Sequence, residues 1–543
     1  MPLEQTGPSA LRFLLPSVRD LIFIFLFWSL LEGPLSNRPL ADADIGWQIR
    51  TGEQILATHS LPRTDSFSST MQGQPWFAWE WLYDVMLGVV HRACGLNGVV
   101  WLCGVLVSAF FALLLSELVR RGTGLVLALV LMLLAECAAT IHLYARPHIV
   151  SWLFSLLWFS VLERCEVSEC GGRPRWMFWF FPASMLFWVN LHGGWLLGLA
   201  LLGIYAWAAF VAAFGGSRVR EPFSAIRATH RARSLAAAWL LSAAATLVNP
   251  YGWKLHAHIY RYLGDRYLMD RIDEFKSPNF HGAAERCFAV ILLMVVIAFW
   301  GRRFPENRPP GNRELPLSGL LVILLACYAG FYSSRNLPVS SMLMVLVAGP
   351  ILGGNFASLG DKPGAWQWLR KGTRQITAFS ERMGKQEIGL RGHLWPVVSV
   401  ALAFAICLQG GWVGSWQAIH AHFDGKQLPV AAVTFLENES AGTEPKREPV
   451  FSTDAWGGYL IYRLYPMRQV VVDDRHDLYG SGRIRQLLIL MQAETGWQKV
   501  LADWRIRTAL LPADSTLASL LRQIPQNWRL VYEDKVAVVF ERR

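Results

Sequence analysis

The sequence has 543 residues, of which 53% are hydrophobic and only 17% charged, and it contains 25 Trp and 30 Phe. This composition excludes a string of soluble domains and indicates a membrane protein with several spans. The formal net charge of +11 does not indicate nucleic-acid binding, because the Arg residues lie in short loops between apolar segments, without a basic stripe that carries stacking aromatics. The eight cysteines lie mostly inside apolar segments and predict no disulfide framework.

The transmembrane part begins with an apolar stretch over Leu21 to Leu31. No small-residue cleavage site follows it, so we expect a retained first span and not a cleavable signal. Apolar runs of the length that a hydrocarbon core demands then recur along the chain. They predict eleven spans, at about 15–35, 97–119, 123–144, 147–163, 177–191, 194–214, 235–248, 287–300, 316–332, 337–355 and 395–416. Two of these, 235–248 and 287–300, are short and are alternatively half-helices.

Basic residues predict the orientation, because Lys and Arg are enriched in cytoplasmic loops. Four clusters stand out: Arg12 and Arg19; Arg218, Arg220, Arg227, Arg231 and Arg233; Arg302, Arg303, Arg308 and Arg313; and Lys362, Arg370, Lys371, Arg374, Arg382, Lys385 and Arg391. All four are cytoplasmic only if the Trp-rich segment 76–92 lies in the interface; a twelfth span through Val85 to Val90 is the alternative. The outer face then receives the loop 37–92, the junctions at 145–148, 190–194, 249–252 and 334–336, and the C-terminal tail. In a bacterium this means an inner-membrane protein with a periplasmic site.

The first outer loop carries the strongest candidate for chemistry. Asp42 and Asp44 are two positions apart, so in an extended chain both carboxylates point to one side, where they can share a metal ion or act as base and orienting partner. Solvated loop acids are the alternative. Trp47 and Glu80 lie in the same loop, and tryptophan prefers the headgroup level of a bilayer. Stacking on a sugar or anchoring of the loop at the interface would both explain Trp47.

Further polar residues interrupt the later spans. Arg146 and Arg335 lie at junctions, where a guanidinium fork can hold a phosphate, although a snorkelling side chain is the alternative. The remaining predicted substrate-binding residues are His148 and Asn336 beside these arginines, and Asn190 and His192 in an NLHGG turn that is alternatively a plain hairpin. A metal cluster of His142, His148 and His192 has little support from their spacing. Glu136 is an acid inside an apolar run and a functional candidate by that position.

The composition changes after about residue 420. Strands are expected at Val450 to Ser452, Gln469 to Val472, Thr508 to Leu511 and Leu530 to Phe540, and helices at Ile484 to Ala493 and Ser515 to Gln523. This alternation predicts a small soluble α/β domain over 420–543, after a transmembrane domain over 1–419. The acids of the run Asp473 to Asp477 follow a predicted strand, which is a common site position, but we favour a turn and capping role for them.

Several motifs bring a family to mind: ADADIGWQIRTGEQIL, SLPRTDSFS and GQPWFAWEWLYD in the first loop, then ARPHIVSWLF, NLHGGWLLGL, NPYGW and SSRNLPV. Together with the tail, they resemble an uncharacterised bacterial group of GT-C glycosyltransferases, which are similar to protein O-mannosyltransferases and to aminoarabinose and Rgt-type sugar transferases. The resemblance covers most of the chain. The first-loop motif differs from the Asp-Glu of the O-mannosyltransferases, because here it is Asp42-x-Asp44.

The resemblance implies a polytopic α-helical GT-C fold of about 11–12 spans, with juxtamembrane helices after the acidic motif. It also implies a transferase that takes a sugar from a polyprenyl-phosphate donor and passes it to a lipid, glycan or protein acceptor. Asp42 and Asp44 would then be catalytic, and Mg or Mn would bind there if a divalent ion is used. The other classes considered are a non-catalytic scaffold and a transporter or flippase of lipid-linked sugars.

Overall fold

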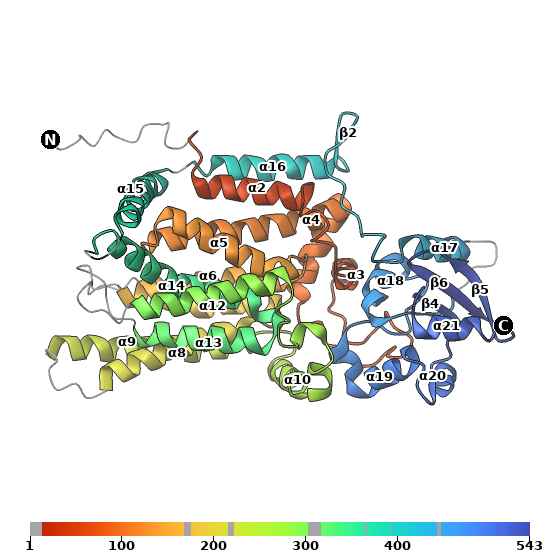
Figure 1. Ribbon diagram of the computed structural model, residues 1–543. Coiled ribbons are helices and arrows are strands. Elements are labelled where there is room, and N and C mark those ends of the chain that lie inside the picture. The colour runs from red at the N-terminus through yellow and green to blue at the C-terminus, as the bar shows by residue number, and fades with distance from the viewer. Residues whose placement is uncertain are drawn as a thin grey trace.

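The computed structural model describes residues 14–167, 175–214, 222–301, 316–362, 364, 366–390, 392–441 and 447–543. These residues form a long helical body and a small α/β domain at one end of it (Figure 1). The chain is thus a mostly helical polytopic protein with a C-terminal sheet domain. Some of the predicted cytoplasmic residues lie outside the described residues: Arg12, Arg218, Arg220, Arg302, Arg303, Arg308, Arg313 and Arg391.

The helical body contains every predicted apolar run. Its elements are α2 (Val18–Leu31), α4 (Trp81–Arg120), α5 (Leu125–Ala139), η1 (Thr140–His142), α6 (His148–Val167), α7 (Arg175–Leu191), α8 (Trp195–Phe214), α9 (Pro222–Ala245), α12 (Ala283–Gly301), α13 (Leu317–Tyr332), η4 (Ser334–Asn336), α14 (Leu337–Leu359) and α16 (Leu394–Leu408). By length and composition, five helical segments of the described chain can cross a membrane: Trp81–Arg120, Leu125–His142, Trp195–Phe214, Ala283–Trp300 and Ser334–Leu359. Three further helices are apolar but shorter: Phe178–Leu191, Leu317–Tyr332 and Leu394–Leu408.

Shorter helices gather at the end of the body that faces the α/β domain. They are α3 (Asp44–Thr58), α10 (Trp253–Gly264), α11 (Arg266–Met269) and η2 (Asp273–Phe275). α3 packs against the first part of α4, and α4 breaks at Gly95, where φ is 60°. Residues 81–94 are therefore a helical arm separate from the rest of α4, and the first part of the Trp-rich segment 76–92, with Trp76 and Trp79, precedes this helix. The basic helix α15 (Gln367–Gly389) lies at the opposite end of the body (Figure 1).

The C-terminal domain is built on a four-stranded sheet with the order β3-β4-β6-β5. The strands are β3 (Val450–Phe451), β4 (Thr508–Pro512), β5 (Trp528–Glu533) and β6 (Ala537–Arg542), with helices α17 (Val430–Ala441), α18 (Asp454–Leu464), α19 (His476–Met491), α20 (Trp497–Asp503) and α21 (Thr516–Arg522). A two-stranded ribbon, β1 (Trp412–Val413) and β2 (Trp416–Gln417), precedes it. The predicted strand at Leu530 to Phe540 is two strands, and the one at Gln469 to Val472 is reduced to single bridges from Val470 to Val450 and Ser68.

The two parts of the protein are joined at a crossing of α3 and α18. A Cβ on Gly46 would lie 2.2 Å from the carbonyl oxygen of Gly458, and one on Gly458 would lie 2.3 Å from that of Ala43. Glycine is therefore required at both positions, because real side chains do not fit between the two backbones. The first outer loop adds backbone hydrogen bonds between Ser69 and Val470 (2.9 Å) and between Val470 and Phe67 (3.1 Å).

A buried ion pair strengthens this junction. The guanidinium of Arg475 is 2.7 Å from Asp65 of the first loop and 2.7 Å from Asp473, and the Arg475 and Asp65 side chains are at most 1% exposed. The same guanidinium lies over the ring of Trp76, 4.6 Å from its centroid. Removal of one partner of such a pair leaves an uncompensated buried charge, which costs about 3–5 kcal/mol. The junction therefore holds the segment around residue 474 in one place.

Candidate active site

The first outer loop positions two carboxylates at the start of α3. Asp44 is the first residue of this helix, where the helix dipole favours a negative side chain. The backbone N–H of Asp44 donates to Oδ1 of Asp42 at 3.0 Å, so Asp42 satisfies one of the free N–H groups of the helix end. The backbone is not extended here, because Ala43 has φ −67° and ψ −27°, so the predicted i, i+2 geometry does not apply; the two carboxylates instead meet at Arg146, which contacts both.

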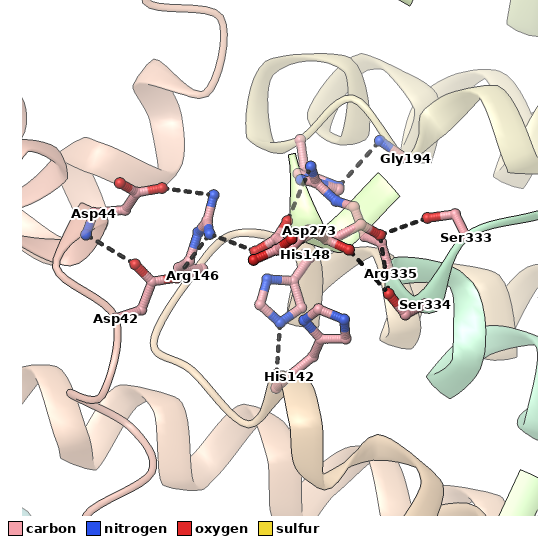
Figure 2. Close-up of polar contacts among 12 residues, drawn as sticks. Asp42, Asp44, His142, Arg146, His148, Gly194, Asp273, Ser333, Ser334 and Arg335 are labelled. Atoms are coloured by element: carbon pink, nitrogen blue, oxygen red, sulfur yellow. Dashed lines mark hydrogen bonds and ion pairs between the residues drawn. The ribbon is translucent and has the colours of Figure 1, made fainter. Parts of the chain in front are cut away.

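Arg146 lies at the centre of the site, in the loop between η1 and α6. Its Nη1 atom is 2.7 Å from Asp42 Oδ2, its Nη2 atom is 2.9 Å from Asp44 Oδ2, and Nη1 is also 3.0 Å from Glu274 Oε1. Figure 2 shows the Arg146 guanidinium facing Asp42 and Asp44. Burial opposes the charge of Arg146, but the carboxylates outweigh it and raise its pKa further.

A second guanidinium shares the same glutamate. Arg335 in η4 places Nη1 3.4 Å from Oε2 of Glu274, which belongs to η2. Burial would raise the pKa of Glu274, but Arg146 and Arg335 outweigh that effect and hold its pKa well below the usual range. Glu274 is thus a carboxylate held between two guanidiniums, which is a geometry that suits any anion with two or more oxygens.

The C-terminal domain completes the pocket. Asp474 and His476 line a cavity of about 400 Å³ together with residues of the helical body. The lining comprises Ala41, Asp42, Ala43, Asp44, Tyr144, Arg146, Tyr262, Ile272, Asp273, Glu274, Phe275, Arg335, Gln427, Leu428, Ala455, Trp456, Asp474 and His476. Nε2 of His476 donates a hydrogen bond to Oδ2 of Asp454 at 3.0 Å, and although burial opposes the charge of the ring, this contact raises the pKa of His476.

Three of these carboxylates could hold a metal ion. One oxygen each of Asp42, Asp44 and Asp474 lies within 4.8 Å of the other two. Within the described part of the chain, Oδ1 of Asp44 and Oδ1 of Asp474 are buried without a hydrogen-bond partner. Burial, with the neighbouring Asp42 charge, raises the pKa of Asp474 to about 7. Carboxylate oxygens are the ligands that a hard divalent ion such as Mg²⁺ or Mn²⁺ prefers.

Behind the pocket lies a second polar layer. Nδ1 of His192 accepts hydrogen bonds from the Ser151 hydroxyl (2.7 Å) and the Gly194 backbone N–H (3.0 Å), so Nε2 carries the proton of the neutral ring. This nitrogen is 3.7 Å from Oε1 of Glu80 and 3.5 Å from Nη2 of Arg335. Burial raises the pKa of Glu80 to about 7, although both arginines oppose the shift. His192 therefore lies next to both Glu80 and Arg335, outside the residues that line the cavity.

The other predicted substrate-binding residues lie away from the pocket lining. Asn190 uses its amide within the body, since Oδ1 accepts from Trp81 and Nδ2 donates to two carbonyl groups. Asn336 donates to the Ala329 carbonyl at 3.0 Å, and His148 contacts the His142 carbonyl at 2.7 Å. Trp47 is 8% exposed and packs edge-on against Trp76. Their contacts with a substrate stay predictions, and the structure gives each of them a packing role.

Sequence reasoning missed three residues of the pocket. For Asp474 and His476 the signal was present, because acids at the end of a predicted strand suggest a site, but we favoured a turn. Glu274 had no such signal. It lies in a polar stretch between two predicted spans, and only the folded chain brings it to Arg146, which is 128 residues away.

The sequence was compared with known proteins after this geometry was established. No family model matches the chain, and no curated protein matches it. Among solved structures, the chain is similar to ArnT from Cupriavidus metallidurans in its apo state, with a TM-score of 0.45 and 12% sequence identity. The alignment covers 96% of this chain and 97% of that one. A match this distant assigns no activity to the site.

Proposed function

We propose that this protein is an integral membrane glycosyltransferase that transfers a sugar from a polyprenyl-phosphate donor to an acceptor on the outer side of the membrane. The observation that carries the proposal is the convergence of Arg146 and Arg335 on one carboxylate, in a pocket that also contains Asp42 and Asp44. The pocket lies where the helical body meets the C-terminal domain (Figure 1). A lipid-linked donor suits this position, because its chain stays in the bilayer while its phosphate reaches the aqueous pocket.

The two arginines supply the phosphate site. Both now contact Glu274, whose two oxygens accept what two phosphate oxygens would accept. When the donor binds, its phosphate takes the place of this carboxylate between the guanidiniums. The arginines then stabilise the negative charge that builds up on the leaving phosphate.

The aspartates supply the base. Asp42 or Asp44 takes the proton of an acceptor hydroxyl, whose oxygen attacks the anomeric carbon. The bond from that carbon to the phosphate oxygen breaks, and its electron pair leaves with the polyprenyl phosphate. Direct displacement of this kind inverts the anomeric centre. General-base assistance is typically worth about 10²–10⁴-fold in rate.

A divalent ion fits the same pocket. Asp42, Asp44 and Asp474 would hold it, each through one carboxylate oxygen. Five carboxylates line this cavity, Asp42, Asp44, Asp273, Glu274 and Asp474, against two guanidiniums, so a dication would offset part of the negative charge. The ion would supply charge neutralisation for an anionic donor. Addition of Mg²⁺ or Mn²⁺ to chelator-treated protein tests this by a rise in thermal stability that Asp474→Asn lacks.

The function is tested with purified protein in lipid nanodiscs. A panel of radiolabelled polyprenyl-phosphate sugars is added with membrane extract as acceptor source, and release of polyprenyl phosphate is measured. We expect turnover with one sugar of the panel and none in the Asp42→Asn/Asp44→Asn double variant. Equal turnover in that double variant would refute the catalytic assignment. Movement of a labelled donor across proteoliposomes without covalent transfer would favour the transporter class instead.

A further inference from the structure

Two cysteines that the proposed chemistry does not use face each other between α5 and α12. The Sγ atoms of Cys137 and Cys287 are 2.7 Å apart, although the residues are 150 positions apart in the chain. This separation is close to the roughly 2.05 Å of a disulfide bond. It is much shorter than an ordinary contact between two sulfur atoms. The two helices that carry them pack against each other.

The pair is also accessible. Both thiols are half-buried, whereas Cys103, Cys165 and Cys407 are buried. Cys137 contacts the carbonyl oxygen of Ala283 at 3.7 Å, which places the pair at the first turn of α12. Both cysteines lie within six residues of the pocket-side ends of the candidate spans Leu125–His142 and Ala283–Trp300.

The pair lies at the pocket end of the body. The chain runs from Cys137 through η1 to Arg146, nine residues later. On the other helix, Cys287 follows η2 and Glu274 by thirteen residues. A link between the two cysteines would tie together the two segments that bring Arg146 and Glu274 into contact.

We propose that Cys137 and Cys287 form a disulfide bond when the pocket end of the protein faces an oxidising compartment. The thiolate of one cysteine attacks the disulfide of a dithiol–disulfide oxidant and forms a mixed disulfide. The second thiolate then displaces the oxidant's sulfur. The two protons and two electrons of the cysteine pair end on the oxidant, which leaves as its dithiol. The proposal rests on the outward orientation of the proposed function, but not on sugar transfer, because disulfides persist only on the oxidising side of a membrane.

The segment over 265–282 carries Glu274 and is also held by hydrogen bonds from Ser333 and Ser334 and by the buried Leu268 and Met269. The bond would add a restraint at its C-terminal end, because α12 begins at Ala283. In the oxidised protein the backbone amides of this segment should exchange with solvent more slowly than in the reduced protein. The link thereby keeps the carboxylate between the two arginines until an anion displaces it.

Mass spectrometry of differentially labelled thiols tests the proposal. Protein purified without reductant is blocked with N-ethylmaleimide, then reduced and labelled with iodoacetamide. We expect the second label on Cys137 and Cys287 and the first on Cys327, a half-buried cysteine of α13 that serves as the matched control. In Cys287→Ser, Cys137 should take the first label. If both thiols take the first label even after treatment with oxidised glutathione, the bond does not form and the proposal is wrong.

Hydrogen exchange tests the consequence. Exchange over 265–282 should be several-fold slower in oxidised than in dithiothreitol-treated wild-type protein, and it should not respond to reductant in Cys287→Ser. Equal rates in both redox states of the wild type would overturn the restraint. Neither measurement uses a sugar donor, so its failure is distinct from a failure of the transferase assignment.

Discussion

Arg146 organises the pocket at the scale of single residues. It contacts carboxylates from three separate segments, Asp42 and Asp44 of the first loop and Glu274 of η2. Its Nε atom is buried and without a partner in the described chain. Substitution of Arg146 itself would leave three carboxylates facing one another, so it reports on folding as much as on chemistry. More informative substitutions change its partners one at a time.

Single substitutions of the two first-loop aspartates test which of them acts as the general base. If Asp42 or Asp44 takes the acceptor proton, that residue's Asn variant should lose about 10²–10⁴-fold in transfer rate, because the amide cannot accept a proton. The other single variant should lose less. Rates of donor turnover measure this, with thermal unfolding as the check on folding. Near-normal rates in both single variants would place the base elsewhere.

Glu274 and Arg335 should respond in opposite directions. Glu274→Gln removes the negative charge that competes with a phosphate, so it should tighten the binding of polyprenyl phosphate by about tenfold, or about 1.4 kcal/mol. Arg335→Gln removes one guanidinium and should weaken it. Binding isotherms at two salt concentrations measure both effects. Changes of the same sign in the two variants would contradict a shared anion site.

The raised pKa of Glu80 predicts that the stability of the folded protein depends on pH. Its pKa is raised to about 7 in the folded protein, above the value of about 4.3 for an exposed glutamate. Such a group favours folding in its protonated form, so its contribution is full below about pH 4 and is lost as the pH rises through 7. Glu80→Gln should therefore unfold at a temperature several degrees higher than wild type at pH 8, and at nearly the same temperature at pH 4.5. A difference that does not change with pH would contradict the shift.

At the scale of elements, the crossing of α3 and α18 determines how the pocket is closed. Ala43 and Asp44 lie on one side of this crossing, and Asp474 follows α18 on the other. Gly458→Ala should push the two helices apart, because its Cβ would lie 2.3 Å from the Ala43 carbonyl oxygen. We expect a loss of about 1–3 kcal/mol in unfolding free energy. Faster tryptic release of the C-terminal domain should accompany it.

The control for this variant is Gly482→Ala on α19, where a Cβ would meet no atom within 4 Å. This substitution should leave the protease pattern unchanged. If both variants behave alike, the close approach of the two backbones is not what holds the domain in place.

The elements themselves were largely predictable from the sequence. The apolar runs fall on helices, because a run of this length has no other stable form in a bilayer, except that the predicted run 395–416 ends beyond α16 in the β1–β2 ribbon. The pocket was predictable only in part. Asp42, Asp44, Arg146 and Arg335 stand out because charge beside an apolar run is costly, whereas Glu274 lies among other polar residues and carries no such signal. The sequence analysis favoured a turn role for Asp474, because an acid after a strand is more often part of a turn than of a site.

At the scale of the whole molecule, the basic helix α15 and the C-terminal domain lie at opposite ends of the helical body (Figure 1). This arrangement agrees with the predicted separation of a basic cytoplasmic side from an outer pocket, and the direction of insertion stays a prediction. It is tested with a membrane-impermeant maleimide on intact cells. Asp503→Cys, in the exposed part of α20, should be labelled directly. Lys385→Cys, exposed on α15, should be labelled only after permeabilisation. The reverse pattern would invert the topology, and wild-type protein measures labelling of the native cysteines.

The division of the pocket between body and tail has a consequence for biogenesis. Asp474 and His476 emerge from the ribosome after every helix of the body has been inserted. A nascent or truncated chain therefore contains Arg146 and the first-loop aspartates without the last wall of the cavity. The cavity is complete only when the final segment has folded against loop residues made more than four hundred positions earlier, so a truncated chain would have an open pocket.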